Sequence, residues 1–318
     1  MKTEILKVLN LKKFFQMINN NATKMDFTLL KPSQVLMKNI HVNWLRFTLG
    51  KTQKHMPVYW NRKTFELCDK NIPCGFITMD KQSTEILTHN LRSVYPEETS
   101  KLALNIIIPQ KDIMKIFIQW QRYRKYWWSS ITTTPSLFSI NDMKLENNEA
   151  NVDILAKFPF GSFPVERITI TCDDNESNHY RLSCTMSLEN ALFIILLDGL
   201  SNYSKEEYLR LHRKITPYKI AFGFNFEDNQ NKERLSKLVQ VLFNKLEGNP
   251  IAALLPSIPM SLDSQIKENL QMGVTYTAIV DETTLENGIF PLLNSSTMLK
   301  EQVHVADFHE YASSLFNY

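Results

Sequence analysis

The sequence predicts a mixed α/β protein with two domains, an α+β domain followed by a smaller α/β domain. Three observations lead to this fold class. The chain has 318 residues, of which 43% are hydrophobic and 22% charged, as expected for one or two globular domains. Its last third alternates strand and helix patterns in the order β-α-β-α-β-β-α. The residues before it mix short strands with helices without that alternation, which indicates an antiparallel sheet with helices.

The α/β domain is expected over residues 217–318. Its helices are marked by apolar residues at a spacing of three or four, and its strands by short apolar runs between turn signals. Pro291 cannot donate a hydrogen bond within a sheet, so the strand that contains it is expected at an edge or at a bulge. The predicted elements are a strand at 218–226, a helix at 232–248, a buried strand at 251–256, a helix at 261–273, a hairpin at 276–290 and an amphipathic helix at 300–316.

The hairpin sequence YTAIVDETTLENGIF contains a cluster of carboxylates. Asp281 and Glu282 are neighbours, so on a strand their side chains would point to opposite faces and could not converge on one substrate. Asn287 and Gly288 lie between two apolar runs, the pattern of a tight hairpin with a type I′ turn. The cluster is therefore interpreted as an exposed polar turn and not as an acid/base pair.

The α+β domain is expected at 26–205, and a charged segment at 206–216 is expected to link the two domains. Residues 1–25 carry five lysines and one glutamate, so their formal charge of +4 leaves about −1 for the rest of a chain whose total is +3. This basic segment could form the amphipathic helix of a mitochondrial presequence, or an ordinary surface helix at the N-terminus. Since the remainder is nearly neutral, binding to nucleic acid would require a local basic patch.

The segment 110–128, QKDIMKIFIQWQRYRKYWW, predicts a helix with one aromatic and one basic face. In one interpretation the aromatic face packs in a core and the basic face is only solvated. In the other, the basic face follows a phosphate backbone and positions it without reading bases. The aromatic face would hold Ile113, Ile116, Phe117, Trp120, Tyr123 and Trp127, and the basic face Lys111, Lys115, Arg122 and Lys125.

Motifs for catalysis or for metal binding are missing from the sequence. The four cysteines, Cys68, Cys74, Cys172 and Cys184, have no C-x-x-C spacing, which favours free thiols over a zinc site. The eight glycines are far apart, so no phosphate-binding loop or dinucleotide fingerprint can form. We therefore expect no cofactor, no metal and no catalytic residues.

Several segments resemble one known family. TPYKIAFGF and GVTYTAIVDETTLENGIFPL are similar to the opening strand and the last hairpin of the anticodon-binding domain of class IIa aminoacyl-tRNA synthetases. The hairpin sequence ETTLENG resembles most closely that of the accessory subunits of mitochondrial DNA polymerase gamma. The resemblance covers residues 213–318 and extends over about 110–205 through WQRYRKYWW, TPSLFS, KFPFG and SLENALFIILLDGL.

The resemblance implies a degenerate class II synthetase-like domain at 26–205 and an anticodon-binding-like domain at 217–318. An active class II synthetase holds ATP with an Arg-x-Glu pair and a later Gly-x-Gly-x-x-Arg stretch. No arginine here is followed two residues later by glutamate, and Asn190 lies about where the later arginine would be. The resemblance thus implies a chain that does not catalyse aminoacylation.

By this resemblance, the chain would be a non-catalytic accessory subunit in the mitochondrial matrix, at the nucleoid. It would bind the catalytic subunit of DNA polymerase gamma and raise affinity for primer-template DNA and processivity. The sequence has no obvious room for the long helical insertion of the dimeric vertebrate members, so a one-to-one complex of the insect type is expected. The partner-binding segment would be Thr284, Leu285, Glu286, Asn287 and Gly288, although Asn287 and Gly288 could instead serve only the turn. Two alternatives are a divergent mitochondrial aminoacyl-tRNA synthetase and a tRNA-binding protein.

Overall fold

A computed structural model places the chain in two compact units, Met1–Leu197 (unit 1) and Asp198–Tyr318 (unit 2). The division falls within one helix, α5 (Leu188–Ser201), ahead of the predicted linker at 206–216. In the described part of that segment, Tyr208, Leu209 and Leu211 are buried. The structure describes residues 2–20, 24–52, 56–63, 72–82, 93–95, 99–146, 149–172, 179–202, 208–225, 229–248, 251–256 and 260–316.

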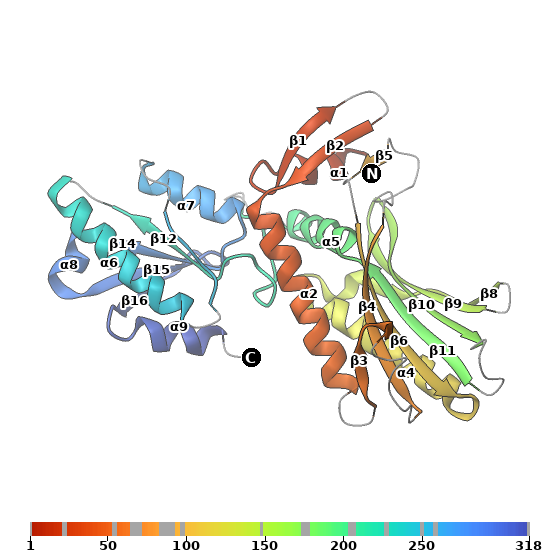
Figure 1. The fold of residues 1–318 in the computed structure, drawn as a ribbon. Helices are drawn as coiled ribbons and strands as arrows, with labels where there is room; N and C mark the ends of the chain where they lie inside the picture. The colour runs from red at the N-terminus through yellow and green to blue at the C-terminus, as the bar shows by residue number, and fades with distance from the viewer. Residues whose placement is uncertain are drawn as a thin grey trace. The chain divides into compact units, whose positions relative to one another are not determined.

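Unit 1 is built on a large, mainly antiparallel sheet (Figure 1). Its strands run in the order β3-β4-β6-β11-β10-β9-β7, β8 also pairs with β9, and only β3 and β4 are parallel. The strands are β3 (Val58–Trp60), β4 (Cys74–Gln82), β6 (Thr99–Pro109), β7 (Phe138–Ile140), β8 (Lys144–Glu146), β9 (Glu149–Phe158), β10 (Gly161–Cys172) and β11 (His179–Ser187). Burial alternates along β9 and β11, as it does in a sheet with one face against a core.

Two long helices, α2 (Lys31–Thr52) and α4 (Ile113–Ile131), accompany this sheet. In α2, buried residues recur every fourth position through Leu36, Ile40 and Trp44, so one side of the helix is packed. A 3₁₀ turn, Gln110–Asp112, leads into α4, and a second one, Pro135–Leu137, follows it. Neither Gly nor Pro interrupts α4, and its core contacts stabilise it.

The first residues of unit 1 differ from the helix that was predicted across 1–25. Only α1 (Lys2–Leu9) is helical there, and Phe15–Asn20 is strand β1, which pairs with β2 (Lys24–Leu29) in a small sheet with β5 (Ser93–Tyr95). Phe14 and Phe15 are buried, and the Phe15 ring stacks on Phe193 of α5 with centroids 5.3 Å apart. The helical periodicity fails because Phe15 lies in strand β1, where its ring packs against Phe27 of β2 as well as Phe193 of α5.

Unit 2 has a five-stranded sheet in the order β13-β12-β14-β15-β16 (Figure 1). β12 and β13, and β12 and β14, are parallel, while β14, β15 and β16 are antiparallel. The elements are β12 (Ile220–Phe224), α6 (Asn229–Glu247), β13 (Ala253–Leu254), α7 (Leu262–Gln271), β14 (Tyr276–Val280), α8 (Glu282–Asn287), β15 (Ile289–Asn294), β16 (Lys300–His304) and α9 (Phe308–Phe316).

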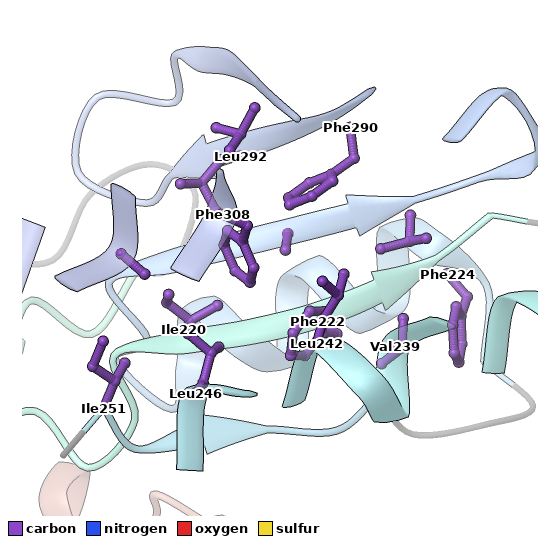
Figure 2. Packing of buried hydrophobic residues seen from close by; sticks show 14 of the residues in the cluster. Ile220, Phe222, Phe224, Val239, Leu242, Leu246, Ile251, Phe290, Leu292 and Phe308 are labelled. Atoms are coloured by element: carbon purple, nitrogen blue, oxygen red, sulfur yellow. The ribbon is translucent and has the colours of Figure 1, made fainter. Parts of the chain in front are cut away.

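The core of unit 2 joins α6 and α9 to one face of this sheet. Figure 2 shows Phe222 of β12 near Leu242 of α6. In the same cluster, the Phe290 ring of β15 meets Phe308 of α9 edge to face at 5.0 Å. Leu235, Val239, Leu242 and Leu246 are the buried residues of α6. Every residue of β12 is buried, because α7 covers its other face through Leu262 and Gln265. The predicted mixed α/β fold class is confirmed, with the synthetase-like character considered below.

Four predicted elements of unit 2 were wrong in detail. The connection from β14 to β15 is the six-residue helix α8 and not a two-residue type I′ turn. Lys300–His304 is a strand, so the last helix begins only at Phe308. β13 is a two-residue, half-buried strand at the sheet edge, while β15, which contains Pro291, lies inside the sheet; its pairing with β14 begins only at Leu292.

In the described part of the chain, every helix is too short or too polar to cross a lipid bilayer.

Candidate functional site

The predicted basic residues all lie on exposed surface at α4. Lys115, Arg122 and Lys125 are exposed on α4, and Lys111 is exposed in the 3₁₀ turn before it. Phe117, Trp120 and Trp127 are buried on the opposite side. Ile113, Ile116 and Tyr123, which were assigned to the aromatic face, are half-buried. The helix therefore has both faces that the sequence indicates.

The C-terminal half of α2 lies beside α4. The Trp127 indole donates a hydrogen bond to Asn43 Oδ1 at 2.9 Å. The Lys51 ammonium lies 4.9 Å from the centre of the Tyr123 ring, within the range of a cation–π contact. Phe47 and Tyr126 approach with ring centroids 6.2 Å apart. The exposed side of α4 is thus bordered by aromatic and basic residues of α2.

Sequence reasoning missed a buried ion pair beneath this surface. Arg124 Nε lies 2.6 Å from Glu166 Oε1, and the two side chains are 1% and 0% exposed. The Trp128 indole donates to Glu166 Oε2 at 2.8 Å, so both carboxylate oxygens have a donor. The Arg124 guanidinium also lies 4.4 Å from the centre of the Trp127 ring. By its spacing, Arg124 lies on the aromatic face of α4. A charged residue on a buried face indicates a buried partner of opposite charge.

The environment of this pair also affects a neighbouring thiol. Burial, and then the negative charge of Glu166, raise the pKa of Cys184 well above its usual range. Cys184 is therefore protonated and inert at neutral pH. Cys74 and Cys184 are buried free thiols and Cys172 is an exposed one, whereas Cys68 lies outside the described residues.

A hollow of about 290 Å³ opens beside the pair, where β9, β10, β11 and the start of α5 meet. Three of its charged residues are paired: Glu166 holds Arg124, and Arg167 pairs with Asp153, its opposite residue in the β9–β10 register, at 2.8 Å. Lys101 of β6 also lines the hollow. Asn190 lines the hollow where a synthetase-like chain is expected to place an arginine, and its buried Oδ1 has no hydrogen-bond partner in the described structure. The side chains present here thus form no arginine clamp for phosphates.

Among the described residues, His, Cys, Asp and Glu side chains form no group of three that could hold a metal ion.

The proposed partner-binding segment forms α8 and its caps. Asp281 Oδ1 accepts a hydrogen bond from the Thr284 amide at 3.0 Å, and Thr284 Oγ1 accepts one from the Asp281 amide at 3.2 Å. This capping box fixes the first turn. Gly288 ends the helix with φ of 73°, a left-handed conformation in which its amide donates to the Thr284 carbonyl.

Exposure divides this segment into structural and accessible residues. Thr284 is buried and Leu285 packs against the core of unit 2. A Cβ on Gly288 would lie 2.7 Å from Nε2 of the exposed His304 side chain, which would have to shift. Glu286 and Asn287 are exposed. Asn287 Oδ1 accepts a hydrogen bond from the Ile289 amide at 2.8 Å, which leaves Glu286 as the residue most available to a partner.

Two basic groups at the start of unit 2 are perturbed by burial. Desolvation, helped by neighbouring cations that include Lys214, lowers the pKa of His212 to about 4. The neutral ring accepts a hydrogen bond from the Lys214 amide at Nδ1. Desolvation also lowers the pKa of Lys219 to about 8, and its ammonium donates to the Arg213 carbonyl. Both groups stabilise the entry into β12 through backbone contacts.

Comparisons with known proteins identify relatives of both units. Residues 225–315 match the anticodon binding domain family. The mitochondrial DNA polymerase subunit gamma-2 of Drosophila melanogaster is 24% identical over 309 residues, which cover 86% of this chain and 82% of that protein. The corresponding Xenopus laevis protein is 24% identical over 85% of this chain and 66% of its own length. A glycine–tRNA ligase of Borrelia hermsii is 23% identical over 54% of this chain and 43% of its own length.

Fold and comparisons together define the class: the chain combines a class II synthetase-like fold with an anticodon-binding domain. Within this class, its relatives over most of the chain are DNA polymerase gamma-2 subunits, and it fits an accessory subunit of mitochondrial DNA polymerase gamma. The resemblance that the sequence indicates is confirmed.

Proposed function

We propose that this chain is the non-catalytic accessory subunit of a mitochondrial DNA polymerase. It binds the catalytic subunit, tightens the hold of that subunit on primer-template DNA and so raises processivity. The observation that carries this proposal is the similarity to gamma-2 subunits over most of the chain. In the hollow, Asn190 stands where an arginine is expected and the lining arginine Arg167 is paired with Asp153, which supports a role without aminoacylation. A partner that prefers the DNA-bound polymerase lowers its dissociation rate by thermodynamic coupling.

The corresponding relatives support a mitochondrial location, and we infer the matrix and the nucleoid within it. The proposed import signal at residues 1–25 overlaps Phe14 and Phe15, which are packed in unit 1. Similarity to the Drosophila melanogaster protein over 82% of its length supports a chain of the insect type, and we propose a one-to-one complex with the catalytic subunit.

Primer extension on a long single-stranded template tests the main proposal. When this protein is added to the matching catalytic subunit, the products should become longer, because the coupled complex dissociates more slowly from DNA. Synthesis should also fall to half only at a higher salt concentration. Heat-denatured protein serves as the control. Product lengths that do not respond to the folded protein at any salt concentration would contradict the role.

One alternative is favoured by a specific observation, the match to a glycine–tRNA ligase. A divergent synthetase would exchange pyrophosphate into ATP only when its amino acid is present. Such exchange would replace the accessory-subunit proposal with an enzyme. The other alternative, a tRNA-binding protein, is supported by the anticodon binding domain match and would bind tRNA tightly without a polymerase.

We further propose that the basic residues at α4 contact the phosphates of primer-template DNA. Changing Lys111, Lys115, Arg122 and Lys125 together to alanine should weaken DNA binding and flatten its dependence on salt, by up to about four in the slope of log K against log salt. Filter binding of a primer-template at several salt concentrations measures the slope. Since all four side chains are exposed, the melting temperature should stay unchanged. A slope equal to that of the unaltered protein would contradict the contact.

A further inference from the structure

The surface shared by α2 and α4 has a composition that the basic face of α4 alone does not reveal. Neither helix contains a single Asp or Glu, although together they span 41 residues, 22 in α2 and 19 in α4. Lys38, Arg46 and Lys51 of α2 are exposed, as are Lys115, Arg122 and Lys125 of α4. Within the described structure, no carboxylate pairs with Lys115, Arg122 or Lys125. Such a surface is complementary to a polyanion.

Apolar and aromatic side chains lie between these cations. Met114, Ile118 and Tyr126 are 52%, 43% and 63% exposed. At 100° per residue, they share an arc of about 120° of the helix surface with Lys115, Arg122 and Lys125. Exposed apolar groups add nothing to the binding of a phosphate alone, since phosphate contacts are polar.

The arrangement of the rings favours contact with flat partners. A hollow of about 410 Å³ on this face is lined by Ile118, Tyr123 and the stems of Lys115 and Arg122, together with Gln119. Phe47 lies beside Tyr126, with the two ring planes inclined by 31°. Lys51 lies over Tyr123 and 5.5 Å from the centre of the Phe47 ring, so cations and aromatic faces alternate across the boundary between the helices.

We propose that the α2–α4 surface binds unpaired nucleotides, with a base stacked on Tyr126 and the adjoining phosphates held by Lys115, Arg122 and Lys51. This inference rests on the proposed contact with DNA. It adds that the surface binds the single-stranded part of primer-template DNA. A duplex hides its base faces inside the stack and offers mainly phosphates to this surface. A single strand offers base faces as well, and stacking on aromatic side chains is a sequence-tolerant source of affinity. The exposed Tyr126 ring among the cations of this surface therefore fits a single strand better than a duplex.

The test compares strand forms and uses the full chain with conservative variants of one residue. Fluorescence anisotropy would measure affinity for a labelled 20-mer of thymidylate and for a duplex of the same length. The single strand should bind more tightly. Tyr126→Leu, which keeps apolar area but removes the ring, should weaken binding of the single strand about tenfold and leave duplex binding within about twofold. Tyr126→Phe, which keeps the ring, should bind as the unaltered protein does.

Further measurements distinguish a failure of this inference from a failure of the proposed function. Lys51→Ala should weaken binding of the single strand, and Lys245→Ala, which removes an exposed cation from α6 of unit 2, is its control. An oligouridylate of the same length distinguishes RNA from DNA as the source of the unpaired strand. Equal losses on single strand and duplex for Tyr126→Leu, or tighter binding of the duplex, would overturn the inference. Primer extension by the mixture with unaltered protein tests the accessory role independently, so stimulation without strand preference would reject only the inference.

Discussion

Replacing Arg124 with leucine should lower the free energy of unfolding of unit 1 by about 3–5 kcal/mol, the cost of leaving a buried carboxylate without its partner. Glu166 would keep only the hydrogen bond from the Trp128 indole. All five tryptophans of the chain lie in unit 1, so denaturation followed by tryptophan fluorescence reports on this unit. We expect a clear shift of its midpoint to lower denaturant.

The same helix supplies a control. Arg122→Leu removes an exposed cation two positions earlier, and it should change the free energy of unfolding by less than about 0.5 kcal/mol. The double variant Arg124→Leu with Glu166→Leu should recover much of the loss, because no charge then remains buried. If Arg124→Leu were no more costly than Arg122→Leu, the ion pair would not stabilise unit 1.

Gly288→Ala should destabilise unit 2 by about 2 kcal/mol, since a residue with a Cβ pays 1–2 kcal/mol in the left-handed conformation and here also meets His304. Because unit 2 has no tryptophan, far-UV circular dichroism should show an earlier transition while the tryptophan transition stays in place. Gly248→Ala, at a glycine where no atom lies closer than 3.6 Å to the new Cβ and φ is not positive, is the matched control.

Comparing Gly288→Ala with Glu286→Ala tests whether α8 contributes to binding the catalytic subunit. Glu286 is exposed, so this variant should melt as the unaltered protein does. If α8 contacts the catalytic subunit, as we propose, Glu286→Ala should weaken co-purification with that subunit without any loss of stability. Full co-purification with Glu286→Ala would instead leave Asn287 and Gly288 with a purely structural role at the end of α8.

Much of unit 2 could be predicted because its signals are local and long. α6 has apolar residues at helical spacing over several turns, and Ser261 and Gly273 bracket α7 as a cap and a left-handed residue. α8 escaped prediction because six residues are too few for a periodic pattern and because Asn-Gly is also the preferred hairpin turn. The sequence KEQVH has one apolar residue among polar ones, which fits an edge strand as well as a helix.

The candidate surface was only partly predictable for a different reason. Spacing along one helix was enough to separate the buried Phe117 and Trp120 from the exposed Lys115 and Arg122. The partners from other elements could not be found this way. Glu166 is 42 residues from Arg124, and Asn43 is 84 residues from Trp127. No periodicity within a helix encodes such separations, which only packing of the whole unit determines.

The absence of carboxylates from α2 and α4 has a kinetic consequence. The two helices carry eight formal positive charges, and since the chain totals +3, the remaining residues sum to −5. Charge is therefore distributed unevenly along the chain despite its small net charge. A polyanion approaching at low ionic strength would be attracted toward the α2–α4 surface, which orients the encounter before any contact forms. With a Debye length of about 8 Å at physiological salt, this guidance acts only over the last steps of approach.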